Sequence, residues 1–189
     1  MGATFLFSLP ACSSQSLDEP APETEEVVLN DTVTEEPVWI ANNLNTNERA
    51  VLEFLQAYGI TDKVALATVK GNIKQESKFD TRVCEGGART GYWGCRRGGF
   101  GLIQWTTYGR YNGLGRHAKQ RGLDPNTLEA QLSWMITETE WRKVEHIFKT
   151  PNLSRGAYMN AAHRWLGWGV HGSRSHYTTH YINHLYRNT

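Results

Sequence analysis

The sequence predicts an α+β protein that is predominantly helical, with one small hairpin lobe and an extended acidic leader. Apolar residues recur at helical spacing through most of residues 46–189. A glycine-rich stretch bracketed by Cys84 and Cys95 interrupts this pattern, and its composition favours a short hairpin. Residues 13–45 have no helical period and are rich in acidic residues, proline, serine and threonine, and a short apolar run precedes them. We therefore expect a leader over residues 1–45 and one folded domain over residues 46–189.

The acidic and basic residues are unevenly distributed along the chain. The net charge of all 189 residues is +1, yet residues 1–48 contain nine acidic residues and no basic ones. Residues 49–189 contain 20 basic and 10 acidic residues, a net charge of +10. A basic body attracts anionic polymers such as peptidoglycan, and nucleic acid would be attracted by the same field. Because no recognised nucleic-acid motif accompanies the charge, no nucleic-acid partner is expected.

The start of the leader resembles a lipoprotein signal. The sequence Leu9-Pro10-Ala11-Cys12 is similar to the lipobox of bacterial lipoproteins, in which the cysteine carries the lipid. Pro10 departs from that pattern, and the apolar run is short with no basic residue before it. The alternative is an apolar plug that packs into a neighbouring subunit of a virion. No run of about 20 apolar residues occurs, so no transmembrane segment is predicted.

Two helices are predicted at the start of the folded domain. The first covers residues 46–58, with polar capping residues at its start and Gly59 as its C-cap. The second covers residues 62–77 and reads as mostly buried, because apolar residues recur along it at helical spacing. It carries Glu76 in its last turn.

Glu76 is the candidate catalytic acid. The negative end of the helix dipole and partial burial beside Phe79 both disfavour the charged carboxylate, so its pKa should be raised. A carboxylic acid with a raised pKa can protonate the leaving sugar oxygen in glycoside hydrolysis near neutral pH. From this segment alone, a solvated glutamate at a frayed helix end remains the alternative.

Cys84 and Cys95 could close a short loop in the expected hairpin lobe. A disulfide bond here would imply life outside the reducing cytosol, and two free thiols are the alternative. A metal site is disfavoured because the pair lacks ligand spacing.

After Trp105 the sequence is helical to its end. Helices are predicted over residues 108–121, from 127 toward 148 with or without a kink, over 154–166 and over 175–187.

Several histidines occur in this region, including two i, i+4 pairs in the last helix. We interpret them as a polar face, because that helix contains no carboxylate and has tyrosines beside the histidines. No metal and no cofactor is predicted. These histidines are His146, His163, His171, His176, His180 and His184.

Two short motifs carry a family resemblance. The segments Gly71-Asn72-Ile73-Lys74-Gln75-Glu76-Ser77 and Gly101-Leu102-Ile103-Gln104-Trp105-Thr106, in this order and spacing, resemble the phage tail lysozyme family of the lysozyme-like superfamily. The resemblance covers roughly residues 48–187. It implies a lysozyme-like catalytic domain, a muramidase-type glycosidase that cuts the glycan strand of peptidoglycan with Glu76 as acid. It also implies a tail-associated enzyme of a phage particle that opens the wall locally, with other tail proteins holding the leader.

Glu85 is the candidate second carboxylate. It follows Glu76 by nine residues, and Thr90 is a candidate for positioning water. Some phage lysozymes show a similar order of acid, acid and threonine, although the second interval here is one residue shorter. If Glu85 is not needed, Asp80 is the other nearby carboxylate.

Polar and aromatic residues are expected to line a glycan-binding groove. Gln104 would hydrogen-bond to N-acetyl or hydroxyl groups, and Trp105 and Tyr108 would stack on sugar faces. Tyr92 and Trp168 are further aromatic candidates. For Trp105, packing in the core is the alternative.

Other readings of the sequence stay open. A lytic transglycosylase would use one acid and no activated water, and a host-lysis endolysin would perform the same chemistry away from the particle. A non-catalytic wall-binding or structural virion module would use the same basic, aromatic surface. In each case the expected location is the virion or the host cell envelope, with Cys12 as a potential lipid anchor.

Overall fold

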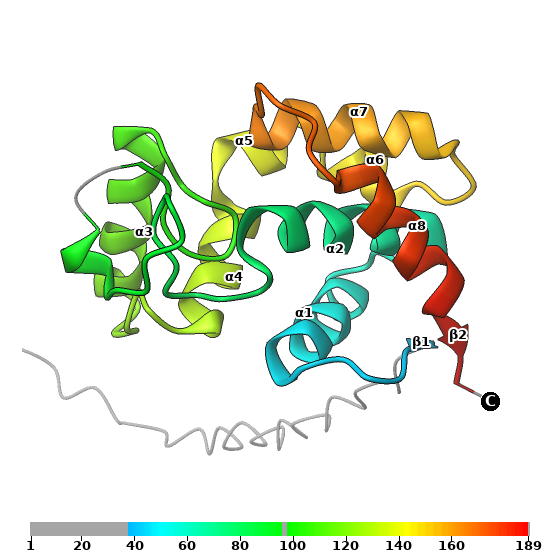
Figure 1. Cartoon of the computed structure of the whole chain (residues 1–189), viewed down its shortest axis with the longest axis horizontal. Coiled ribbons are helices and arrows are strands. Elements are labelled where there is room, and N and C mark those ends of the chain that lie inside the picture. Colours follow the sequence, from blue (N-terminus) through cyan, green and yellow to red (C-terminus); the bar gives the residue numbers. More distant parts are fainter. Residues whose placement is uncertain (1–37, 96–97, 189) are drawn as a thin grey trace, which may run out of the picture. The chain divides into compact units, whose positions relative to one another are not determined.

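The structure, a computed structural model, describes residues 38–95 and 98–188. This part of the chain is predominantly helical, as predicted (Figure 1). The lipobox around Cys12 lies outside the described residues. The helices are α1 (Thr46–Ala57), α2 (Lys63–Ser77), α3 (Tyr108–Gln120), α4 (Leu128–Thr137), α5 (Thr139–Arg142), α6 (Glu145–Lys149), α7 (Arg155–Leu166) and α8 (Arg174–His184), with a 3-10 turn at Tyr92–Gly94.

Helix α2 packs against helices α1, α6, α7 and α8, and most extensively against α8 (Figure 1). Asp62 caps its first turn, accepting hydrogen bonds from the amides of Val64 at 2.8 Å and Ala65 at 2.9 Å. On its α8 face, Gly71 allows close packing, because a Cβ there would come within 2.6 Å of the Thr178 amide nitrogen. The two helices can therefore approach backbone to backbone.

The ends of the described domain are joined by a small sheet. Strand β1 (Trp39–Ile40) pairs antiparallel with β2 (Tyr186–Arg187). The Gln56 side chain of α1 holds β1 in place by accepting from the Trp39 amide at 2.7 Å and donating to the Trp39 carbonyl at 2.9 Å. The prediction that the last helix reaches residue 187 is wrong, because this pairing takes residues 186–187 out of the helix.

The lobe between Cys84 and Cys95 has less strand structure than a hairpin. Isolated antiparallel bridges join Val83 to Arg89 and Cys84 to Phe100, and no continuous strand forms between the two cysteines. Cys84 and Cys95 form the disulfide bond that the sequence left open. Cys84 is bonded to Cys95 through the disulfide and is also bridged to the Phe100 backbone. The segment between the two cysteines therefore forms a loop and not a strand pair.

The predicted segment from residue 127 toward 148 breaks into three helices. Glu138 separates α4 from α5, with an extended backbone at φ −68° and ψ 149°. Its side chain is 1% exposed and accepts hydrogen bonds from the Trp105, Arg110 and Trp165 side chains. At this kink the Glu138 carboxylate points into the core, where the buried donors compensate its charge.

Candidate active site

Glu76 lies in the last turn of α2, as predicted, and its side chain is 15% exposed. The helix ends there because Lys78 and Phe79 both adopt left-handed backbone conformations, with φ of 53° and 65°. The neighbouring Ser77 hydroxyl donates to the Leu102 carbonyl at 2.7 Å. This bond ties the helix end that carries Glu76 to the second motif of the sequence.

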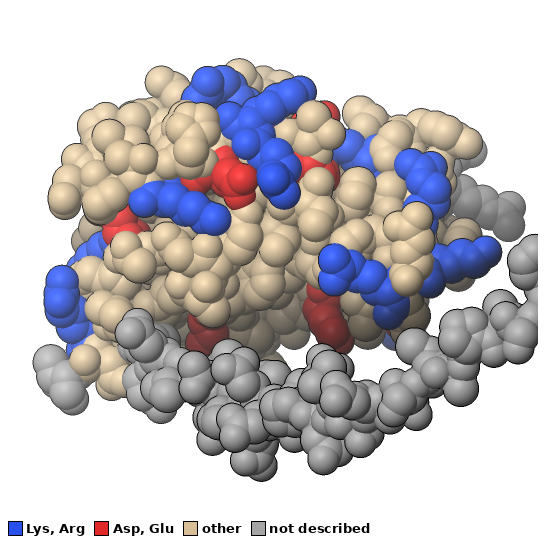
Figure 2. Space-filling model, turned by 180° about the vertical axis from the view of Figure 1, so that it is seen from behind, with Lys and Arg blue, Asp and Glu red and all other residues tan. Residues whose placement is uncertain are grey.

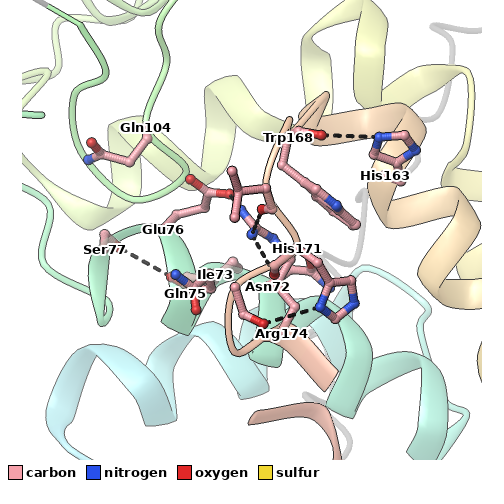
Figure 3. A network of polar contacts seen from close by, with 12 residues as sticks. Asn72, Ile73, Gln75, Glu76, Ser77, Gln104, His163, Trp168, His171 and Arg174 are labelled. Atoms are coloured by element: carbon pink, nitrogen blue, oxygen red, sulfur yellow. Dashed lines mark hydrogen bonds and ion pairs between the residues drawn. The ribbon is translucent and has the colours of Figure 1, made fainter. Parts of the chain in front are cut away.

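Arg174, the first residue of α8, is the partner of Glu76. Its Nη2 atom forms an ion pair with Glu76 Oε1, and its side chain is only 5% exposed (Figure 3). Its Nη1 atom donates to the carbonyls of Val170 and His171, both at 2.9 Å. The guanidinium also lies 4.4 Å from the centre of the Trp168 ring. The loop between α7 and α8 thus fixes the arginine against the acid.

Burial and charge act on Glu76 in opposite directions. Burial raises the pKa of the Glu76 carboxyl, while Arg174 and Arg110 lower it, and the net direction is upward. Glu76 and Arg174 therefore differ from an ordinary surface ion pair, because the Glu76 carboxyl binds its proton more tightly than a solvent-exposed glutamate does. Such a group can act as a general acid.

Hydrogen bonds from Gln131 and Gln104 hold the loop of the second motif. Gln131 of α4 accepts from the Leu102 amide at 2.8 Å and donates to the Thr81 carbonyl at 2.7 Å. Gln104 donates to the carbonyls of Gly101 at 3.0 Å and Val83 at 3.2 Å. The donor side of the Gln104 amide is thus used within the loop, while its Oε1 atom accepts no hydrogen bond in the described part of the chain.

Two aromatic residues proposed for the groove are core residues instead. Trp105 is 0% exposed, and its indole nitrogen donates to Glu138 at 3.1 Å. Tyr92 is 1% exposed, stacks on Tyr111 with ring centres 4.4 Å apart and donates to the Tyr111 carbonyl. Neither ring has a face accessible to a ligand in this structure, because both side chains are buried in the hydrophobic core.

The other two aromatic candidates are accessible. Tyr108 is 85% exposed at the first position of α3. Trp168 is half-buried and joins the site through its contact with Arg174 (Figure 3). Of the four aromatic candidates from the sequence, Trp168 is therefore the one that contacts Arg174, the partner of Glu76.

The causes of the Glu76 pKa shift are burial, Arg174 and Arg110, with no carboxylate among them. Glu85 is exposed in the lobe. Asp80 is engaged in an ion pair with Arg89 and accepts from the Arg82 amide at 2.9 Å. Thr90 is half-buried beside Gly94.

Sequence reasoning missed Arg174, Arg110 and Glu138. Arg174 is 98 residues from Glu76, and nothing local distinguishes it from the other arginines of the basic body. Arg110 pairs with Glu138 through bonds of 2.8 and 2.7 Å while its charge acts on Glu76. These roles exist only once the helices are packed.

Basic side chains outweigh acidic ones on one face of the domain. On the face drawn in Figure 2, Lys and Arg side chains cover more of the surface than Asp and Glu do. No set of three or more His, Cys, Asp or Glu side chains that could hold a metal ion occurs within the described ranges. None of the described helices is long and apolar enough to cross a membrane.

A family model described as phage tail lysozyme matches residues 46–173. This range begins at the first residue of α1 and includes Glu76 and both sequence motifs. No curated protein and no solved structure matches the chain.

Proposed function

The chain belongs to the phage tail lysozyme family, and we therefore propose that it cuts the glycan strand of peptidoglycan as a muramidase-like glycoside hydrolase. The observation that carries the proposal is the environment of Glu76. This carboxyl lies at a helix end, is largely buried and has a raised pKa. A protonated carboxyl in that setting can donate its proton to the glycosidic oxygen as the sugar leaves.

Arg174 supports the same step after proton transfer. Once Glu76 has given up its proton, the carboxylate would be left in a partly buried place, which is unfavourable without a cation. The guanidinium already in contact with Glu76 Oε1 supplies that cation. We propose that Arg174 limits the rise in the pKa of Glu76 and stabilises its anionic form.

For binding, we propose that Gln104 Oε1 accepts a hydrogen bond from the N-acetyl group or a hydroxyl group of a sugar. Trp168 and Tyr108 are the proposed stacking residues, because both have accessible ring surface. The net charge of +10 on residues 49–189 favours a wall polymer that carries carboxylates.

Glu85 is the proposed second carboxylate, with Thr90 as the proposed water-positioning residue. A lytic transglycosylase is the second candidate, because no carboxylate is among the causes of the Glu76 pKa shift and this enzyme class needs only one acid. The two reactions differ in their products, since an anhydro sugar end has one water less than a hydrolysed end. Mass spectrometry of the released fragments distinguishes them.

We further propose that the enzyme acts as a tail-associated virion component, with residues 1–45 as the segment held by the particle. The disulfide bond between Cys84 and Cys95 supports a place outside the reducing cytosol. Purified virions should contain the chain. Its absence from particles, with appearance only late in infection, would support a host-lysis enzyme instead.

Replacement of Glu76 by glutamine tests the central proposal. The amide keeps the shape but cannot donate the proton, so wall lysis should fall by about 10²- to 10⁴-fold while wall binding persists. Glu129→Gln is the matched control, because Glu129 is exposed on α4. If Glu76→Gln clears walls at more than about a tenth of the parental rate, Glu76 is not the acid. If the parental protein binds walls without releasing fragments, the non-catalytic binding module is the correct reading.

A further inference from the structure

The side-chain amide of Gln75, the residue before Glu76, contacts the start of α8. The backbone N–H of Ser173 donates a hydrogen bond to Gln75 Oε1 at 2.8 Å. Ser173 occupies the N-cap position of α8, and Arg174 is the first residue of that helix. Within the described chain, no other hydrogen bond joins the loop of residues 167–173 to α2. Two neighbouring residues of α2, both drawn in Figure 3, are therefore bonded to two neighbouring residues at the start of α8.

Helix α8 has no side-chain cap of its own at this end. The Ser173 side chain makes no capping hydrogen bond, and the third helical residue is His176. A capping box requires Glu or Gln at that third position, where the side chain accepts from the N–H of the N-cap residue. Helix α1 has such a box, formed by Asn45 and Glu48. In α8 the acceptor for the N-cap amide is instead Gln75, which belongs to another helix.

Gly172 leaves the space that the Gln75 amide occupies. Its φ is 57°, in the left-handed region that glycine adopts readily. A Cβ atom at this position would come within 2.9 Å of Gln75 Cδ and Nε2 and 3.0 Å of Gln75 Oε1. Any larger residue here would therefore displace the amide from its bond to Ser173.

The contacts that hold the Arg174 guanidinium belong to the same loop. Its Nη1 atom donates to the carbonyls of Val170 and His171, and the centre of the Trp168 ring lies 4.4 Å away. All three of these residues lie in the loop of residues 167–173. Because the guanidinium is bound to this loop, its distance from the acid depends on where the loop lies relative to α2.

We propose that Gln75 is a positioning residue, which holds Arg174 against Glu76 by fixing the start of α8 to α2. This inference rests on the proposed function of Glu76 as the acid. Without the bond the body of α8 stays packed on α2, because Gly71 and Thr178 are in close contact farther along the two helices. The first turn of α8 and the preceding loop gain freedom, so the guanidinium spends less time in contact with the carboxylate.

The test is Gln75→Met in the full-length protein, which keeps the length of the side chain and removes the amide oxygen. The pKa of Glu76 is measured by NMR titration of ¹³C-labelled glutamate, with the signal assigned from Glu76→Gln. Loss of an ordinary hydrogen bond that acts wholly through Arg174 raises this pKa by about 0.4 to 1 unit. The alkaline limit of kcat/KM on solubilised wall should rise by the same amount. Gln120→Met, at the exposed last residue of α3, is the matched control and should change neither quantity.

Combination with Arg174→Gln separates positioning from a general structural effect. In that background the arginine is absent, so Gln75→Met should cause no further shift in the pKa of Glu76. A shift of equal size in both backgrounds, or no shift in the parental background, would overturn the proposal. The NMR titration needs no turnover. A parental protein that leaves walls intact would therefore remove the proposed function, while the titration still decides the role of Gln75.

Gly172→Ala reaches the same bond from the other side and provides the second variant if Gln75→Met does not fold. Its Cβ atom would displace the Gln75 amide, so the pKa of Glu76 should again rise. Gly167→Ala is the matched control for left-handed strain, because its φ is 68° and a Cβ atom there meets nothing within 4 Å in the described structure. Equal shifts in the two alanine variants would assign the effect to backbone strain and contradict the role of Gln75. Circular dichroism checks that each variant is folded.

Discussion

The guanidinium of Arg174 forms an ion pair with the carboxylate of Glu76, although the two residues are 98 positions apart in the sequence. One is the first residue of α8 and the other lies in the last turn of α2. The close packing of these helices at Gly71 brings them together. The pKa of Glu76 is therefore lowered by a residue that is distant in the sequence.

Arg174→Gln should move the alkaline limit of activity to higher pH. The acid must be protonated, so kcat/KM falls as pH rises through the pKa of Glu76. Removing the cation removes an effect that lowers this pKa, so the limit should rise by up to about one to three pH units. The measurement is the pH profile of kcat/KM on solubilised wall. Arg174→Lys keeps the charge and should leave the limit near its parental value. An unmoved limit in Arg174→Gln would show that Arg174 does not act on the acid.

Glu85→Ala distinguishes one-acid from two-acid chemistry. If Glu85 is the second carboxylate, lysis should fall by about 10²-fold or more, with binding retained. Asp80→Asn is the companion variant, because Asp80 is paired with Arg89 rather than free. Initial rates of turbidity loss on a wall suspension provide the measurement. Full activity in both variants would favour the single-acid transglycosylase.

Glu138→Gln should destabilise the domain while leaving the exposed surface unchanged. The variant removes the charge that compensates Arg110 and weakens the bonds from two buried indoles. Breaking one side of a buried ion pair typically costs about 3–5 kcal/mol of unfolding free energy. Urea denaturation measures the change. Glu129→Gln on the exposed side of α4 should cost less than about 0.5 kcal/mol, and equal losses in the two variants would contradict the structural role.

Lys70→Met should reduce the pH dependence of stability. Lys70 is 0% exposed, its Nζ donates to the Glu48 carbonyl at 2.9 Å, and burial lowers its pKa to about 7. The Tyr181 ring 4.7 Å away favours the charged form, but desolvation is the larger effect. Between pH 7 and about 10.4 the unfolded chain binds the proton that the folded chain has released. Unfolding free energy therefore rises with pH in this window, by up to about 1.4 kcal/mol per unit.

Urea denaturation at several pH values between 6 and about 10 measures the Lys70 contribution. The methionine variant should lose this slope and should gain stability relative to the parent at the acidic end. Lys119→Met, at an exposed position of α3, should keep the parental slope. Parallel stability curves for the parent and Lys70→Met would mean that Lys70 titrates alike in both states.

Local sequence patterns were sufficient to predict the helical class, the position of Glu76 at the end of α2 and the start of most helices. These are local features: apolar spacing, capping residues such as Asp62, and glycine and proline at the helix ends. It also identified the two motifs that the structure joins through the Ser77 bond to Leu102. The disulfide bond between Cys84 and Cys95 was one of two readings that local composition allowed.

Which side chains lie near Glu76 and which fill the core depends on how the helices pack. Trp105 and Trp168 are both tryptophans near polar segments, yet one donates to buried Glu138 and the other lies against Arg174. Likewise, the i, i+4 spacing is the same for both histidine pairs of α8, but the rings of His180 and His184 stack while the His176 ring contacts Tyr177. Such differences arise from contacts between segments far apart in the chain, and these contacts depend on how helices pack rather than on local pattern.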